Sequence, residues 1–145
     1  MPNTLRYRNS DFYNVANQEA TVFKSFAGVV SGTGGLTVWT PASGKKFVVK
    51  GFAIGAVVAT TLTGTATQLH LVDDSYAAAN ILWPLASYSA TAAAGTVLRS
   101  PTPTVLPFKP NGFVGSAINR VVKIVCDAAA GQNISVSGVI WGDEV

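Results

Sequence analysis

The run RVVKIVCDAAAGQNISVSGVIW, residues 120–141, contains the pattern that decides the fold: two stretches of alternating apolar and polar residues on either side of a short turn. Successive side chains of a β-strand point to opposite faces, so Lys123 marks the outward side and Val122 and Ile124 point inward. The turn AAAGQN contains glycine and asparagine, which are typical of turns, and the alternation resumes over Asn133–Trp141. The region predicts two β-strands joined by a loop.

The same two-residue period recurs along most of the chain. Segments rich in Gly, Pro, Asn, Asp and Ser, such as SGTGG at 31–35 and KPNG at 109–112, separate the strands, and the Ala-rich segments 75–80 and 90–95 are expected to be loops. Short strands at this spacing predict an all-β antiparallel sandwich or barrel. The expected strands are Thr21–Val30, Leu36–Thr40, Lys46–Val58, Thr67–Val72, Ile81–Leu85, Thr96–Arg99, Thr104–Phe108, Arg120–Cys126 and Asn133–Trp141.

The phase of the alternation also predicts the core. Residues on the apolar side of each strand should be buried between the two layers of the sandwich. The expected core residues are Val22, Phe47, Val49, Leu69, Leu71, Val122, Ile124, Ile134 and Val136.

The first twenty residues do not follow this period. Polar residues there alternate irregularly with Leu5, Tyr7, Phe12 and Tyr13. This pattern predicts an arm over 1–20 that either becomes ordered by contact with a partner or lies frayed on its own domain. The remaining residues, 21–145, are expected to form a single domain.

The composition argues against several classes of function. The chain has one His, one Cys, seven carboxylates and 12% charged residues, an inventory too thin for most hydrolase, transferase or metalloenzyme sites. We therefore expect a protein that is not an enzyme and needs no cofactor. The net charge of +3 arises from ten basic residues spread along the chain rather than a dense basic stripe, so nucleic-acid binding is not expected.

The high apolar content predicts self-association. With 48% hydrophobic residues and a mean hydropathy of +0.35, part of the apolar surface outside the core should lie against a partner or a second copy. No stretch approaches the ~18 apolar residues of a membrane-spanning helix, and the N-terminal residues lack the apolar core of a signal peptide. Neither membrane association nor export by that route is expected.

Few individual residues suggest chemistry. His70 alternates with Leu69 and Leu71, so it should lie on the solvent or interface side, and no nucleophile or carboxylate motif accompanies it. Cys126 has the inward phase and is expected to be a small core residue without a disulfide partner.

The acidic residues are expected to be structural. Asp73-Asp74-Ser75 follows a strand and offers too few oxygens for a calcium site, so an Asx-type turn is the better interpretation. Asp143 and Glu144 should form a solvated tail.

Two further patterns have a functional and a structural interpretation. Gly32, Gly34 and Gly35 could suggest a phosphate loop, but a strand rather than a helix follows them, so a hairpin turn is expected. The three tryptophans at 39, 83 and 141 could form a sugar-stacking platform, although most large aromatic residues of a sandwich fill the core and the subunit seams.

The runs WTPASGKKFVVKGFAIG at 39–55 and NISVSGVIWGDE at 133–144 resemble a pattern found in small β-sandwich proteins of tailed-phage virions. Capsid decoration (cement) proteins are the most similar of these in size, in their single β-domain with a terminal arm and in lacking a catalytic set. The resemblance implies a trimer on the outside of the capsid, at local three-fold positions, which bridges neighbouring capsid subunits.

These expectations together describe a jelly-roll-like antiparallel β-sandwich that forms an oligomer, expected to be a homotrimer, and stabilises a viral shell. Its partners would be copies of itself and the major capsid protein, and it would be made in the host cytoplasm and reside on the capsid surface. The arm residues expected to contact the capsid are Leu5, Arg6, Tyr7, Arg8, Phe12 and Tyr13. A carbohydrate-binding module of a phage tail or fibre, and a small enzyme with a polar pocket around His70 or Asp73, are the alternatives.

Overall fold

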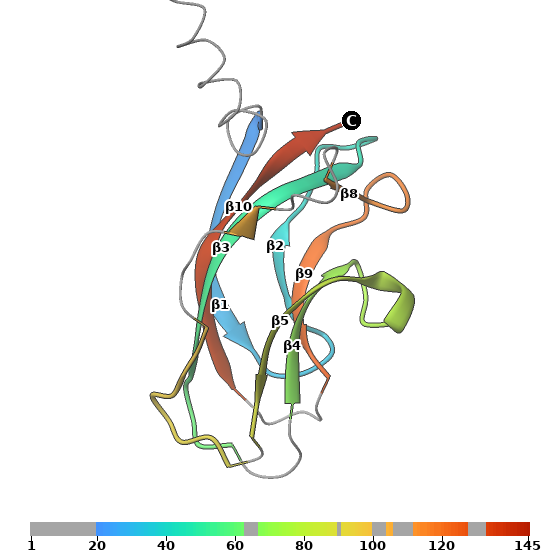
Figure 1. Cartoon of the computed structure of the whole chain (residues 1–145). Coiled ribbons are helices and arrows are strands. Elements are labelled where there is room, and N and C mark those ends of the chain that lie inside the picture. Colours follow the sequence, from blue (N-terminus) through green and yellow to red (C-terminus); the bar gives the residue numbers. More distant parts are fainter. Residues whose placement is uncertain (1–19, 63–66, 90, 100–103, 106–111, 128–132) are drawn as a thin grey trace, which may run out of the picture.

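The computed structural model describes residues 20–62, 67–89, 91–99, 104–105, 112–127 and 133–145. These residues form two antiparallel sheets that pack face to face (Figure 1). One sheet has the order β1-β10-β3-β6, with the short strands β7 and β8 also paired to β3, and the other has the order β2-β9-β4-β5. The strands are β1 Val22–Val30, β2 Leu36–Trp39, β3 Phe47–Val58, β4 Thr67–Asp73, β5 Ile81–Tyr88, β6 Val97–Arg99, β7 Thr104–Val105, β8 Phe113–Val114, β9 Val122–Cys126 and β10 Ile134–Glu144.

The strand pairs are nested, which makes the sandwich a jelly roll. β1 pairs with β10, β2 with β9, β3 with β6 and β4 with β5, all antiparallel. Two further antiparallel pairs, β10 with β3 and β4 with β9, complete the two sheets. Two sheets of four principal strands connected in this way are the jelly-roll arrangement of two Greek keys. The expected all-β, jelly-roll-like sandwich is therefore confirmed.

The core lies between the two sheets, and the predicted phase of the strands is correct. All the expected core residues are buried except Val22, which is half-buried and packs against the core at the edge of its sheet. Aromatic rings join the layers: Trp83 of β5 contacts Phe52 of β3 and Phe113 of β8, each at 6.4 Å between ring centroids. The interior is thus filled by side chains from both sheets.

The glycine-rich segment 31–35 is not the expected hairpin turn. It joins β1 of one sheet to β2 of the other, so it crosses between the layers instead of pairing two neighbouring strands. Gly35 has a φ of 65°, and a Cβ at this position would lie 2.5 Å from the carbonyl oxygen of Ile124. Glycine is required there by both its backbone conformation and its close approach to β9.

Candidate interaction surfaces

The outer face of the β1-β10-β3 layer carries uncharged outward side chains from Phe23 to Val29 and beside them on β10 and β3. β1 alternates half-buried and exposed residues, and its outward positions are Phe23, Ser25, Ala27 and Val29. The strand register places Ser25 beside Val139, Ala27 beside Ser137 and Val29 beside Ser135. On β3 the next positions across the sheet are Ala53, Gly55 and Val57.

This face is hollowed in its middle. The central rows of the sheet contain small residues, among them Ala27, Ser137 and Gly55, and larger valines stand around them. The hollow has a volume of about 880 Å³, and none of its lining residues is titratable. They are Ala27, Gly28, Val29, Ala53, Gly55, Ala56, Val57, Val97, Ser135, Val136, Ser137, Gly138 and Val139. Such a surface offers shape, apolar contact and serine hydroxyl groups rather than acid-base or nucleophilic chemistry.

Large apolar side chains stand exposed around the hollow. Phe23 is 60% exposed, Val29 53% and Val97 65%. The sequence predicted that apolar surface outside the core would lie against a partner, but it did not locate that surface. The outward-facing residues of β1, β10 and β3 could each be identified from the alternation. That these three strands lie side by side could not be read from the sequence, so the position of this exposed apolar surface could not be predicted.

Polar contacts hold together the end of the same sheet that lies near the C-terminus marked in Figure 1. Asp143 and Glu144 take part in them, so the expectation that these two residues form a solvated tail is wrong. Asp143 belongs to β10, forms an ion pair with Lys50 (2.5 Å) and accepts hydrogen bonds from the backbone N–H and the hydroxyl of Thr21 (both 2.9 Å). Burial alone would raise the pKa of Asp143, but the hydrogen bonds from Lys50 and Thr21 and the charge of Lys50 together lower it. Glu144 likewise accepts hydrogen bonds, from the indole N–H of Trp39 (2.9 Å) and the backbone N–H of Ala42 (3.0 Å).

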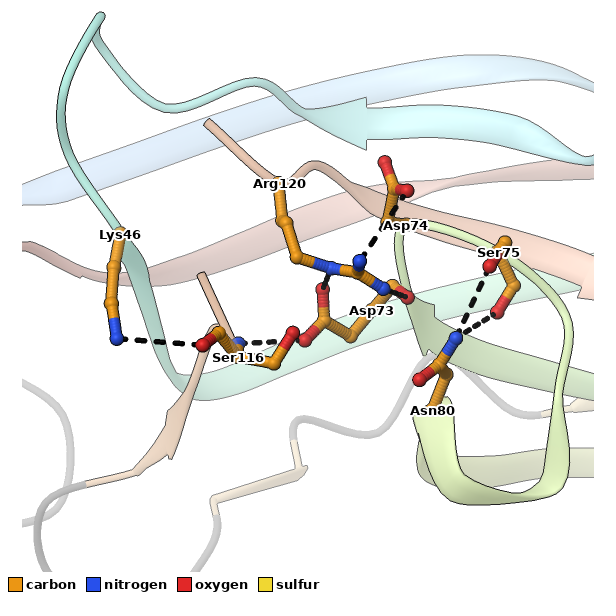
Figure 2. Close-up of polar contacts among 7 residues, drawn as sticks. All are labelled: Lys46, Asp73, Asp74, Ser75, Asn80, Ser116 and Arg120. Atoms are coloured by element: carbon orange, nitrogen blue, oxygen red, sulfur yellow. Dashed lines mark hydrogen bonds and ion pairs between the residues drawn. The ribbon is translucent and has the colours of Figure 1, made fainter. Parts of the chain in front are cut away.

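A second polar cluster lies at the end of β4 (Figure 2). Asp73 is only 4% exposed; its carboxylate accepts hydrogen bonds from Nε of Arg120 and the backbone N–H of Ser116, both at 2.8 Å. Nη2 of Arg120 also donates to the Asp73 carbonyl oxygen at 3.1 Å, and Nη1 lies 3.9 Å from Oδ2 of Asp74. The hydrogen bond to Asp73 raises the pKa of Arg120 further above its already high ordinary value.

These contacts give the Asp73 cluster a structural role. They tie the end of β4 to the loop between β8 and β9, and both carboxylate oxygens of Asp73 are engaged. The chain turns here, as expected, with Asp74 at a φ of 67°, but the turn is not of the expected Asx type, because the backbone N–H of Ser75 donates to the carbonyl oxygen of Asp73 (2.8 Å) rather than to its carboxylate. Within the described ranges no group of three or more His, Cys, Asp or Glu residues is arranged to hold a metal ion.

His70 is on the expected side of β4, opposite Leu69 and Leu71, but it is buried within the chain, so the expectation of solvent exposure was wrong. It is 4% exposed, and the ring of Tyr76, from the β4–β5 connection, lies against it at 5.8 Å between centroids. Burial lowers the pKa of His70, and the charge of Asp127 opposes the shift only in part. Its Nδ1 has no hydrogen-bond partner among the described residues. The alternation fixed its side correctly but could not show that a connecting loop would cover it.

Cys126 is a buried, free thiol, as expected. Its Sγ lies 3.3 Å from the hydroxyl of Tyr88, and burial raises its pKa above the ordinary value. A buried thiol with a raised pKa is a poor nucleophile.

The tryptophans do not form an exposed platform. Trp39 and Trp141 are 1% and 7% exposed, and Trp83 packs against the core. Within the part of the chain that the structure describes, the indole N–H of Trp141 has no hydrogen-bond partner. The arm residues expected to contact a partner (Leu5, Arg6, Tyr7, Arg8, Phe12 and Tyr13) lie outside the described residues.

Compared with known proteins, the chain matches no family model, no curated protein and no solved structure. A separate observation concerns helices: within the described ranges, none is long and apolar enough to cross a membrane.

Proposed function

We propose that this chain is a virion structural protein, which associates with copies of itself as a trimer and stabilises a viral shell by binding the outer surface of the capsid. The observation that carries the proposal is the uncharged, hollowed outer face of the β1-β10-β3 layer. It is a surface suited to packing against another protein, and large exposed apolar patches commonly mark such interaction sites.

The fold supports the proposal but does not decide it. Jelly rolls occur in viral capsid proteins, in lectins and in cupins, so the fold alone does not identify the function. The resemblance to decoration proteins adds the partner, the major capsid protein, and the location, the outside of a capsid assembled from proteins made in the host cytoplasm. The apolar and basic residues of the arm, from Leu5 to Tyr13, would supply the capsid contact.

The mechanism would be added contact area and multivalency. One copy that binds a single capsid site gains only the free energy of that contact. A trimer that engages several equivalent sites makes each later contact intramolecular, so the whole complex binds more tightly than any single copy. Contacts that bridge neighbouring capsid subunits would oppose their separation.

Cosedimentation with shells tests this proposal. The purified protein is centrifuged alone and with tailed-phage capsids that lack their own decoration protein, at several shell concentrations. We expect saturable binding, with a plateau at three copies per local three-fold position. Absence from the shell pellet at every concentration would contradict the capsid role. If the same purified protein binds immobilised glycans saturably but does not bind shells, the result would favour the carbohydrate-binding alternative. Lectins are among the proteins with this fold.

A further inference from the structure

β1 forms one edge of its sheet. Among the described residues it pairs only with β10, which leaves the other side of a nine-residue strand open. Natural edge strands are commonly protected by prolines, bulges or charged side chains, including charges that point inward. The β1 sequence VFKSFAGVV contains no proline and its pairing with β10 has no register shift, but its single charged residue, Lys24, has the inward phase and protects the edge. The uncharged outer face, rather than the edge itself, is therefore the surface suited to contact another protein.

The charge of the face favours a second copy of this chain as the partner. The chain carries a net charge of +3, so copies that meet through their basic residues would repel each other. The outward side chains from Phe23 to Val29, and those beside them on β10 and β3, contain no charge. Two copies that meet here bring no like charges together, and an acidic or basic partner would find no complementary charge.

The size of the face is sufficient for such a contact. β1, β10 and β3 run side by side for about 30 Å and, at about 4.8 Å per strand, cover roughly 14 Å, to which the short strand β6 adds little, so the face measures about 400–500 Å². A ring of three shares each face between two neighbours, so its three contacts together bury roughly 1,200–1,500 Å², and the ring as a whole exceeds the lower bound of about 1,000 Å² for a specific interface.

The face combines one protruding side chain, Phe23, which we call the knob, with the hollow described above. Two hollows placed directly opposite each other would leave a void, which is unfavourable in a packed interface. Phe23, the most exposed aromatic residue of this face, stands on the same strand as Ala27 in the hollow, four residues away or about 13 Å. Its ring is too far away to fill the middle of the hollow around Ala27 in its own chain, but it can enter that of a neighbour.

We propose that copies of this chain associate through this face, with Phe23 of each copy seated in the hollow over Ala27, Gly55 and Ser137 of the next. In a two-fold pair each Phe23 would fill the hollow of the other copy, whereas a head-to-tail contact continues to a third copy and closes into a ring when the rotation between copies allows it. The proposed trimer uses the head-to-tail contact. The inference rests on the proposed function only for the number of copies, three. The contact itself is independent of any shell.

Matched substitutions test the contact in the full chain. Phe23→Ser removes the knob and Ser137→Arg places a charge in the hollow. Their controls are Ile118→Ser, at a loop residue that is 55% exposed, and Ser87→Arg, at an exposed serine of β5 on the other sheet. Sedimentation velocity from 1 to 100 µM measures association, and thermal melts confirm that each variant is folded.

We expect the wild type and both controls to associate with dissociation constants within twofold of one another, and both test variants to associate at least tenfold more weakly. If the wild type associates and the test variants match it, copies meet through another face and the proposal is overturned. A wild type that stays monomeric to 100 µM also overturns it. Shell binding is measured separately on the same samples, so a failed contact with intact shell binding overturns this contact but leaves the capsid-binding role standing.

Crosslinking provides a second test, which reports which two positions meet; it is carried out at 100 µM because Phe23→Cys also removes the aromatic ring. Phe23→Cys protein is mixed with Ser137→Cys protein and oxidised. Within one chain the two positions are too far apart to form a disulfide, because Ser137 lies opposite Ala27 rather than Phe23. We expect a covalent dimer in the mixture and little from Ser137→Cys alone. Equal yields in the mixture and the Ser137→Cys sample would overturn the seating of Phe23.

Discussion

Glu144 shows how one side chain can stabilise two parts of this fold. It lies at the end of β10 and accepts hydrogen bonds from Trp39 in the opposite sheet and from Ala42 in the following loop. Trp39 is 1% exposed, so its indole N–H has no access to solvent as an alternative partner. The hydrogen bond from Trp39, followed by that from Ala42, holds the pKa of Glu144 below its ordinary value of 4.5, and the charges of Lys24 and Lys45 add to this effect.

This pKa shift predicts a pH-dependent effect of Glu144→Gln. A lowered folded-state pKa stabilises the protein above the unfolded pKa, and the stabilisation is lost as the pH falls through the folded pKa. A hydrogen bond to a charged acceptor contributes roughly 1 kcal/mol more than one to a neutral acceptor. We expect the variant to unfold with about 1 kcal/mol less free energy at pH 7, and the difference from wild type to fade toward pH 3.

Urea titrations at pH 7, 5 and 3 measure this difference. Asp74→Asn is the control, because Asp74 has only a 3.9 Å ion pair with Arg120 and its side chain is 42% exposed. A deficit for Glu144→Gln that is the same at pH 3 and pH 7 would exclude the charge as its cause.

Ile124 tests the packing between the layers. It is fully buried in the middle of β9, and its register partners are Leu36 of β2 and Leu71 of β4. Ile124→Ala leaves a cavity that the two sheets cannot readily close, so we expect a loss of about 2–5 kcal/mol in the free energy of unfolding. Ile118→Ala, at an exposed position, should change it by less than about 0.5 kcal/mol. Similar losses for the two variants in denaturant melts would contradict the assigned core.

At the scale of elements, β10 is an interior strand of its sheet, paired with β1 on one side and β3 on the other. Gly138 lies in the middle of this strand, and a Cβ there would collide with the carbonyl oxygen of Ala53 on β3. The close backbone approach therefore requires glycine in a strand that is otherwise rich in β-branched residues.

The variant Gly138→Ala should separate β10 from β3 locally and destabilise the fold by about 1–3 kcal/mol. Gly34→Ala is the matched control, because a Cβ added there would have no other atom within 4 Å and its φ is outside the left-handed region. We expect that control to be neutral or slightly stabilising. Thermal melts compare the two variants. Equal melting temperatures would show that β10 can move away from Ala53 without loss of stability, which would contradict the prediction.

The strands could be predicted from the sequence because one face of each sheet is buried, so the two-residue period is strong. β10 extends to Glu144, beyond the predicted end at Trp141, because the register shift between Trp141 and Gly142 interrupts the alternation while the pairing with β3 continues. The strand β8 contains only Phe113 and Val114, too short for any period to be detected.

The surfaces could not be predicted in the same way, because they depend on which strands become neighbours. Phe23 and Ser137 are more than a hundred positions apart, and the pairing of β1 with β10 places them on one face. The coverage of His70 by Tyr76 depends in the same way on the path of a loop. Local alternation determines which way a side chain points, whereas the topology determines what it meets.

At the scale of the whole molecule, the nested strand pairs bring the two ends of the described chain together. Thr21, just before β1, donates its backbone N–H to the carbonyl oxygen of Gly142 at 3.0 Å, and its hydroxyl donates to Asp143. Among the described residues, these contacts close the domain where β1 begins beside the end of β10.

Deletion of residues 2–16 tests whether the arm belongs to the domain or to its partner. The truncated chain keeps Thr21, Phe23 and the hollow, so we expect it to melt at the same temperature and to associate with copies of itself as the full chain does. If Leu5, Tyr7, Phe12 and Tyr13 contact the capsid, its binding to shells should weaken at least tenfold, because a multivalent complex loses one contact in every copy. A full-length variant with these four residues changed to serine is the control for chain length and should show the same defect. Unchanged shell binding by both would exclude the arm from capsid contact, and a truncated chain that fails to fold or associate would place the arm in the domain or in the contact between copies.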